Sequence, residues 1–382
     1  MHQTGPTIGI IGAGQLARML IEAAIPLDLD IRILAADSTD GAARIWHHVT
    51  IGSPDDPEAV TRFAAGCDVV TFDHELVSES VLIALEQLGA RLAPSAATLR
   101  IAQNKQRQRE LFARIGLPQP CFRIAHTRHD AEQAGEAIGY PLVLKAAAGG
   151  YDGRGVWTCA AETNLTPVAD QLAARGIAMI TETLVPIERE LAVMIARDMR
   201  GRITVLPTVE TTQIAGICRQ IVYEAEAEHV DATTLARSVA ETVDLTGIMA
   251  VELFASEGHL LLNEIATRPH NSGHYSIEAL TTSQFEQHLR AISGLAPGST
   301  VPRTPVAATV NILGPADGSD PRDYLASLDC PDAKVHLYGK TARPGRKLGH
   351  VTVCGDDRAA CVEMAWRAVE HLTREHRPEE IQ

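Results

Sequence analysis

In the N-terminal part of the chain, short apolar runs alternate with stretches whose apolar residues recur at helical spacing. TIGIIG at 7–12 predicts a buried strand, and QLARMLIEAA directly after it predicts an amphipathic helix. Further strands are predicted at IRILAAD and CDVVTFD, and SESVLIALEQLGA is expected to be helical. This βαβ order predicts an N-terminal α/β domain, residues 1–98, built on a parallel sheet.

The central part, residues 99–298, has a different order of elements. LRIAQNKQRQRELFARIGLP at 99–118 predicts one amphipathic connecting helix that ends at Gly116 and Pro118. Strands are expected at 141–147, 178–185 and 190–198, a hairpin at 249–266, and helices at 233–245 and 283–294. These elements predict an α+β domain.

A linker containing Pro297, Gly298, Pro302 and Pro305 precedes the C-terminal part. Beyond it, AATVNILG, KVHLYGK and KLGHVTVCG predict three strands, and AACVEMAWRAVEHLTRE predicts a closing helix. These elements indicate a small third domain, residues 299–382. The whole chain is therefore expected to be a multidomain α/β and α+β protein.

The composition limits the class of partners. The chain has 382 residues, with 34 Lys plus Arg against 48 Asp plus Glu, and its formal net charge of −14 repels the phosphate backbone of nucleic acids. Its seven cysteines are scattered and odd in number, which favours a reducing cytoplasm over secretion. No apolar run approaches the roughly 18 residues of a membrane helix. We therefore expect neither a nucleic-acid partner nor a membrane partner.

Two glutamates lie within the predicted hairpin AVELFASEGHLLLNEIA. With SEGH as the turn, Glu252 and Glu264 lie nearly opposite each other, and Asn271 can fold back toward them. Carboxylates this close repel each other unless a cation lies between them, and hard oxygen ligands suit Mg²⁺. The alternative is an ordinary hairpin with two solvated glutamates, although the apolar neighbours of both residues predict strands covered on both faces.

A glycine-rich segment, GGYDGRG, follows the strand that contains Lys145. Its glycines, Gly149, Gly150, Gly153 and Gly155, allow positive φ and close approach of backbone N–H groups to phosphate oxygens. Lys145 and Arg154 are cations suited to the same oxygens. The segment is thus either a lid over a nucleotide or a flexible hairpin loop.

The segment GAGQLA at 12–17 is similar to the G-x-G-x-x-A dinucleotide fingerprint, and Asp37 lies where a ribose-binding acid would be expected. The fingerprint requires only an anionic group at a helix N-terminus, and the phosphate of a phosphorylated substrate would serve as well as a pyrophosphate. NAD binding is therefore one of several interpretations of this segment.

Two polar segments are further candidates for anion binding. TRPHNSGH directly follows the strand of Glu264, and HLYGKTARPGRKLGH concentrates cations in an otherwise acidic chain. The polar residues are Arg268, His270, Asn271, Ser272 and His274 in the first segment, and Lys340, Arg343, Arg346, Lys347 and His350 in the second. A single histidine could equally be a hydrogen-bonded loop residue, and the second segment could equally be a solvated hairpin tip.

In this order the motifs resemble the ATP-grasp superfamily and, within it, the N5-carboxyaminoimidazole ribonucleotide synthetase family. The resemblance covers nearly the whole chain and rests on GAGQLARM at 12–19, TFDHELV at 71–77, VLKAAAGGYDGRG at 143–155, ERELAV at 188–193, NEIATRPHNSGHYSIEALTTSQFEQHLRAI at 263–292 and HLYGKTARPGRKLGH at 336–350. It implies an ATP-grasp fold with a Rossmann-like N-terminal domain and a small C-terminal domain.

The resemblance further implies an ATP- and Mg²⁺-dependent carboxylate–amine ligase of purine biosynthesis. ATP would phosphorylate bicarbonate to carboxyphosphate, and the amine of aminoimidazole ribonucleotide would take up the carboxyl group. ADP and phosphate would be the other products. A cytoplasmic homodimer is implied in the same way.

The resemblance also implies roles for individual residues. For ATP it implies contacts by Lys105, Lys145, Gly150, Tyr151, Asp152, Gly153, Arg154, Gly155, Val156, Glu182, Thr183, Leu184, Val185, Glu190, Gln213, Asn263 and Glu264. Mg²⁺ would be held by Glu252 and Glu264, and bicarbonate by Arg268, His270 and Asn271, with Asp152 and Arg154 also in the catalytic set. Aminoimidazole ribonucleotide would contact Gln15, Asp73, Glu75, Tyr151, Ser272, Lys340, Arg346 and Lys347.

Three alternatives stay open at this point. A formate-dependent glycinamide ribonucleotide transformylase would share the glutamate hairpin and the glycine lid, but TRPHNSGH and the YGK segment favour the bicarbonate enzyme. An NAD-dependent dehydrogenase would explain GAGQLA, and a catalytically silent nucleotide-binding scaffold would explain the fold. Neither explains two facing glutamates followed by an Arg-x-His-Asn loop. The chain departs from the family pattern at FDHEL, at the three alanines after Lys145, at Thr267 and at Gln213.

Overall fold

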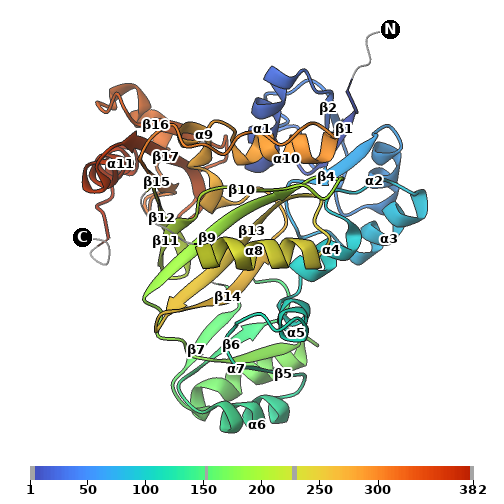
Figure 1. Ribbon diagram of the computed structural model, residues 1–382, viewed down its shortest axis with the longest axis vertical. Coiled ribbons are helices and arrows are strands. Elements are labelled where there is room, and N and C mark those ends of the chain that lie inside the picture. The colour runs from blue at the N-terminus through green and yellow to red at the C-terminus, as the bar shows by residue number, and fades with distance from the viewer. Residues whose placement is uncertain (1–4, 151–153, 226–229, 379–382) are drawn as a thin grey trace.

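The computed structural model describes residues 5–150, 154–225 and 230–378, which form three β-sheets (Figure 1). In Figure 1 the N-terminal sheet lies at the top right, a small four-stranded lobe at the bottom, and the nine-stranded sheet runs from the centre to the upper left. In the described part of the chain, none of the helices is long and apolar enough to span a bilayer.

The N-terminal sheet is parallel, in the order β3-β2-β1-β4, as the βαβ pattern predicted. Its strands are β1 (Ile8–Ile11), β2 (Ile31–Ala35), β3 (Val49–Ile51) and β4 (Val69–Phe72). Its helical elements are α1 (Gln15–Ala24), η1 (Ile25–Leu27), α2 (Pro57–Ala64) and α3 (Glu79–Leu88). Strand β3 and helix α2 are additional to the predicted elements. Since β3 has three residues, of which two are exposed, it carries no apolar run that a sequence pattern could show.

The predicted single helix at 99–118 is wrong, because the structure has two helices there. They are α4 (Ala96–Ala102) and α5 (Lys105–Arg114). The side chain of Asn104 accepts a hydrogen bond from the Arg107 N–H and caps α5, as asparagine commonly does at a helix N-terminus. The apolar spacing continues across this break and conceals it. The break places Lys105 in the first turn of α5.

The small lobe is an antiparallel sheet in the order β5-β8-β6-β7, packed against two helices. Its elements are β5 (Phe122–Ala125), α6 (Arg128–Ile138), β6 (Leu142–Ala146), β7 (Val156–Cys159), α7 (Glu162–Ala174) and β8 (Met179–Thr183). Strands β6 and β8 were predicted. The glycine-rich segment joins β6 to β7, a strand that the prediction did not include.

The glycines of that segment serve different purposes. Gly149 and Gly155 have the predicted positive φ, 78° in both. Gly150 has no positive φ, but a Cβ on it would lie 2.6 Å from the Arg154 carbonyl oxygen. A larger residue would therefore clash where the two ends of the segment come close together. Tyr151, Asp152 and Gly153 lie outside the described residues.

The large sheet has the order β14-β13-β9-β11-β12-β15-β17-β16, with β10 paired to β9. Its strands are β9 (Arg189–Arg197), β10 (Ile203–Val205), β11 (Val209–Ile214), β12 (Ile217–Glu224), β13 (Gly247–Ser256), β14 (His259–Ala266), β15 (Val306–Leu313), β16 (Lys334–Leu337) and β17 (Lys347–Gly355). The helical elements of this part are α8 (Val230–Thr242), η2 (Asn271–Gly273), α9 (Ser276–Ala279), α10 (Gln284–Ser293), η3 (Pro321–Ser327) and α11 (Arg358–Thr373). Because β12 pairs with β15, the C-terminal strands continue the central sheet across the linker.

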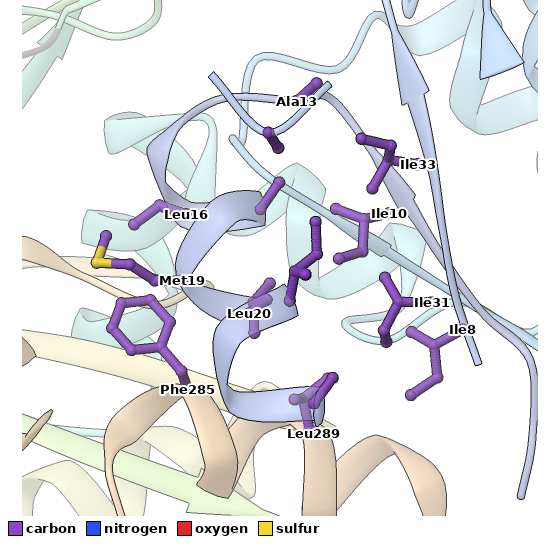
Figure 2. Close-up of a cluster of buried hydrophobic side chains, with 14 of the residues drawn as sticks. Ile8, Ile10, Ala13, Leu16, Met19, Leu20, Ile31, Ile33, Phe285 and Leu289 are labelled. Carbon is purple, nitrogen blue, oxygen red and sulfur yellow. The ribbon is translucent and has the colours of Figure 1, made fainter. Parts of the chain in front are cut away.

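Helix α10 connects the N-terminal sheet to the large sheet and lies beside α1 (Figure 1). Its residues Phe285 and Leu289 are buried in the core that β1, β2 and α1 form (Figure 2). On the same helix, the Nδ1 of His288 accepts the Ile248 N–H of β13 at 3.2 Å, and its Nε2 lies 2.9 Å from the Thr71 hydroxyl of β4.

This junction should make stability depend on pH. Burial lowers the pKa of His288 from an ordinary value of 6.5 to about 4. As pH falls, the unfolded chain therefore takes up the proton first, and the folded state loses stability. We expect this histidine alone to lower the free energy of unfolding by about 1.4 kcal/mol per pH unit between pH 6.5 and 4. Chemical unfolding of the native protein and of His288→Asn should show a difference that shrinks as pH falls, and a constant difference would contradict the expectation.

Candidate active site

The hairpin of β13 and β14 brings the two glutamates together as predicted. Glu252 pairs directly with Glu264, and the register then shifts so that Leu253 pairs with Leu262. Asn263 is the extra residue of this bulge. Successive residues of a regular strand point to opposite faces, but the bulge lets Asn263 and Glu264 serve the same site. The Asn263 Nδ2 lies 3.5 Å from the Glu252 Oε2.

Two lysines reach this hairpin from other elements. Lys105, at the start of α5, contacts the carboxylate of Glu264. Lys145, on β6, donates from Nζ to the Asn263 Oδ1 at 3.2 Å. The structure therefore gathers both predicted phosphate-binding lysines beside the predicted metal-binding glutamates.

The carboxylate of Glu182, on β8, holds Lys145 from another side. Its Oε2 lies 2.8 Å from the Lys145 Nζ, and its Oε1 lies 2.6 Å from the Nε of Arg109 on α5. Burial alone would raise the pKa of Glu182, but the two cations outweigh it and lower the pKa to about 2. Glu182 is 2% exposed and its carboxylate is engaged by both cations, so this side chain is not free to contact an adenine.

Glu190, on β9, is a carboxyl group of a different kind. Burial and the nearby charge of Glu252 raise its pKa to about 7, although the Gln213 side chain forms a hydrogen bond with it. Burial also raises the pKa of Glu252, against the charges of Lys105, Lys347 and Arg268. Burial and the charge of Lys145 lower the pKa of Lys105 to about 8. A raised carboxyl pKa means that the charged form lacks sufficient counter-charge, which favours the binding of a cation near Glu252 and of hydroxyl donors at Glu190.

The loop after β14 is anchored to the segment that follows β4 in the N-terminal part of the chain. Glu75 accepts the Thr267 N–H and hydroxyl, and its Oε2 lies 3.5 Å from the Nε of Arg268. Further along the loop, the His270 Nε2 lies 3.6 Å from the Glu252 Oε1. Glu75, predicted as a substrate contact, thus holds the segment that carries Arg268 and His270 against the hairpin.

Two neighbouring residues of this loop bond to the protein itself. The Asn271 amide exchanges two hydrogen bonds with Asn311 of β15, at 2.8 and 2.7 Å. The Asn271 amide is thus engaged with Asn311, and it is His270 whose ring lies beside Glu252. Ser272, predicted as a substrate contact, is 1% exposed, and its hydroxyl lies 2.9 Å from the His270 Nδ1.

The two remaining histidines of the polar segments are core residues. The His274 Nδ1 lies 2.9 Å from the Gln284 Nε2, and the His350 Nδ1 lies 2.9 Å from the Tyr338 hydroxyl. Both rings are buried, with centroids 4.8 Å apart. For His274 the hydrogen-bonded histidine was the correct alternative. His350 belongs neither to a solvated hairpin tip nor to an anion site, because it is buried in β17.

The cationic segment forms the connection between β16 and β17. The charge of Lys347 acts, besides the effect of burial, to lower the pKa of both Glu252 and His270. This lysine therefore lies near the glutamate site. Lys340 and Arg346 interact with other residues of the same connection. The segment therefore brings cationic charge toward the site. His350 is buried and does not belong to the anion-binding residues that were expected in this segment.

The GAGQLA segment binds a carboxylate of the protein itself. Asp73, at the end of β4, accepts the Gly14 N–H at 2.6 Å and the Ala17 N–H at 2.7 Å. A Cβ on Gly14 would lie 2.4 Å from the Asp73 Oδ2, so the glycine is needed for this approach. Asp73 is thus the anion at the N-terminus of α1, beside Gln15. Because it occupies these N–H groups and Asp37 accepts the Thr39 N–H, the NAD interpretation is not supported.

Replacement of this carboxylate should loosen the N-terminal sheet. Asp73→Asn turns an acceptor oxygen into an NH₂ group that faces a backbone N–H, so we expect a loss of about 1–2 kcal/mol in the free energy of unfolding. Urea unfolding of the variant measures it. Unchanged stability would mean that the carboxylate contributes little to the position of α1.

The comparisons with known proteins agree with this geometry. Residues 6–103 match the ribonucleotide synthetase preATP-grasp domain, residues 110–285 the ATP-grasp domain, and residues 307–364 the phosphoribosylaminoimidazole carboxylase C-terminal domain. Over 377 residues the chain is 40% identical to the N5-carboxyaminoimidazole ribonucleotide synthase of Mycobacterium tuberculosis, covering 96% of this chain and 88% of that protein. The chain belongs to the N5-carboxyaminoimidazole ribonucleotide synthase family.

Solved structures of this family have the same fold. The synthetase from Thermus thermophilus is 34% identical, with a TM-score of 0.86 over 98% of this chain and 100% of that one. The Aspergillus clavatus synthase in complex with ADP and 5-aminoimidazole ribonucleotide is 32% identical, with a TM-score of 0.86 over 97% of this chain and 100% of that one. The predicted family, ligase class and ATP-grasp fold are confirmed.

Several residues of the site in this synthase family member were not predicted. Arg109 lies one helical turn after Lys105, so its spacing could have indicated a shared face toward β8. Asn311 is a lone amide in the apolar run AATVNILG, which is a signal for a buried polar partner. Gln284 stands among other polar residues in its helix, and nothing in the local pattern distinguishes it.

Proposed function

We propose that this ligase carboxylates 5-aminoimidazole ribonucleotide with bicarbonate and ATP, through carboxyphosphate. The products are N5-carboxyaminoimidazole ribonucleotide, ADP and phosphate, in purine biosynthesis. The observation that carries the proposal is the pairing of Glu252 with Glu264, flanked by Lys105, Lys145 and the His270 loop. The similar synthase from Aspergillus clavatus has been solved with ADP and 5-aminoimidazole ribonucleotide.

The two glutamates fit Mg²⁺. Directly paired carboxylates repel each other, and a divalent cation relieves this repulsion. Within the described ranges, no group of three His, Cys, Asp or Glu residues could hold a metal by itself. Glu252 and Glu264 would therefore share the ion with the oxygens of the nucleotide phosphates and water. When bound, the ion supplies positive charge against the phosphates during phosphoryl transfer.

We propose the remaining ATP contacts from the family resemblance and from the positions of the described side chains. Lys145, held by Glu182, presents its ammonium group beside Asn263 for a phosphate oxygen, and Lys105 can exchange its contact with Glu264 for another. Glu190, next to Gln213, would accept the ribose hydroxyls. The segment from Gly150 to Val156 would cover the phosphates, and residues 182–185 would line the adenine.

Bicarbonate would bind where the His270 loop meets Glu252, with Arg268 and His270 as its donors. Asn271 would support this loop through Asn311. The cations Lys340, Arg346 and Lys347 would hold the phosphate of the nucleotide substrate, with Gln15, Tyr151, Asp152 and Arg154 around its base and sugar. A cytoplasmic homodimer with domains at 1–98, 99–298 and 299–382 is part of the same proposal.

One assay tests the proposed reaction. Purified protein is given ATP, Mg²⁺ and bicarbonate, with and without 5-aminoimidazole ribonucleotide, and ADP release is measured. We expect release to be stimulated by that nucleotide. Formate with glycinamide ribonucleotide serves as the control pair for the related transformylase reaction. No stimulation by 5-aminoimidazole ribonucleotide at any protein concentration would reject the assignment.

A further inference from the structure

A single amide side chain holds both backbone groups of His270. Gln284, the first residue of α10, is fully buried. Its Oε1 accepts the His270 N–H at 2.8 Å, and its Nε2 donates to the His270 carbonyl oxygen at 2.8 Å. The same Nε2 lies 2.9 Å from the Nδ1 of His274. The backbone on both sides of the His270 ring is therefore fixed from within the protein.

The loop is shaped to fit this amide. A Cβ on Gly273 would lie 2.5 Å from the Gln284 Oε1, so the glycine allows the loop to close over the side chain. The Gln284 N–H donates to the Ser276 hydroxyl at 2.9 Å, and that hydroxyl donates to the Gly273 carbonyl oxygen at 2.5 Å. The N-terminus of α10 and the loop thus form one hydrogen-bonded unit.

The next residue of the helix faces a different part of the molecule. Phe285 packs with Met19 and Leu20 of α1, and Leu289 lies one turn further along the same face (Figure 2). His288 adds the hydrogen bond to Thr71 of β4. A rigid helix therefore links the position of His270 to the N-terminal α/β part of the chain, where Gln15 begins α1 and Glu75 follows β4.

We propose that Gln284 is a positioning residue for the bicarbonate step. Its amide holds the His270 ring against Glu252, and α10 fixes the position of this loop relative to the N-terminal domain. The proposal rests on the proposed function. Bicarbonate is small and offers few contacts, so a displaced His270 weakens its binding directly. The ATP contacts proposed above lie mainly on β6, β8, β9 and the hairpin, whereas the Gln284 amide bonds to His270 and His274, so we expect the affinity for ATP to be unaffected.

The chain contains a matched control on the same helix. Gln287 is 1% exposed, and it also forms a two-point contact with one backbone unit. Its Nε2 donates to the Gly298 carbonyl oxygen at 2.8 Å, and its Oε1 accepts the Gly298 N–H at 3.0 Å. Replacement of either glutamine by methionine removes the same kind of bond from the same helix, but only Gln284 reaches the His270 loop.

The experiment compares Gln284→Met with Gln287→Met in steady-state kinetics and thermal unfolding. For Gln284→Met we expect the bicarbonate KM to rise at least about tenfold, and ADP release to exceed the carboxylated product, while the ATP KM stays within about twofold. For Gln287→Met we expect both KM values and the product ratio to stay as in the native protein, even where its melting temperature falls equally.

Two results would overturn the proposal. One is a native bicarbonate KM in Gln284→Met, and the other is an equal rise in both variants, which would indicate general loss of structure. If Gln284→Met does not fold, Gln284→Glu keeps the size and the acceptor for the His270 N–H but, once ionised, has no donor for the His270 carbonyl oxygen. A native bicarbonate KM at a pH where this carboxyl is ionised would count against the proposal. Lack of stimulated ADP release in the native protein would instead reject the proposed function.

Discussion

Glu264→Gln should lower turnover at least about a hundredfold while leaving the fold intact. The change removes one of the two paired carboxylates and keeps the size of the side chain. Lys105 contacts Glu264 at a partly exposed position, so loss of this pair should cost little stability. ADP release at saturating ATP measures the effect, and a Mg²⁺ titration should show a higher concentration at half-maximal rate.

The control for this variant lies at the turn of the same hairpin. Glu257→Gln makes the same chemical change next to Gly258, away from Glu252 and the lysines. It should keep native turnover and a native response to Mg²⁺. Full activity of Glu264→Gln, with circular dichroism unchanged, would contradict a metal site at this hairpin.

Glu182→Gln should destabilise the folded protein by about 3–5 kcal/mol, because it leaves the buried cations Lys145 and Arg109 without their carboxylate. The folded-state pKa of Glu182, about 2, lies below its ordinary value of 4.5. Its contribution to stability is therefore complete above pH 4.5 and is lost as pH falls toward 2. Urea unfolding at neutral pH measures the loss, and the difference between the two proteins should shrink below pH 4.5.

An exposed ion pair of the same lobe provides the comparison. The Arg128 Nε lies 2.6 Å from the Glu132 Oε1, the same distance as from Arg109 to Glu182, but the Arg128 side chain is 51% exposed against 3% for Arg109. Glu132→Gln should change stability little, because water solvates both charges when the pair is broken. Equal losses in the two variants would mean that burial does not determine the strength of the Glu182 contacts.

Local patterns were sufficient to predict the elements that carry the site. The parallel start of the fold and the hairpin with Glu252 opposite Glu264 were predictable because strand periodicity and the SEGH turn determine them within a few residues. The bulge at Asn263 was not predictable, since a register shift depends on how the paired strand packs. The break before Lys105 was concealed because apolar spacing continues through it.

The partners of individual side chains were harder to predict, because they come from distant segments. Asp73 was predicted only as a substrate contact, and the structure shows that its carboxylate binds the N-terminus of α1, an interaction that only the close approach of β4 to the glycines reveals. His350 looked like part of an exposed cationic tip, but it lies in β17 within a continuous run of buried residues, 348–353. Lys347 is half-buried at the start of β17 and His350 is buried further along it, and this difference could not be predicted from the residue types.

The pairing of β12 with β15 bears on how the chain folds while it is being synthesised. Residues 217–224 leave the ribosome long before residues 306–313, so β12 has an open edge during that interval. An unpaired edge of this kind can bind a strand of another chain. A protein truncated within the linker would keep this edge permanently, and we expect it to aggregate even though both glutamates of the hairpin are present. The C-terminal strands therefore cover an edge of the sheet that carries the paired glutamates.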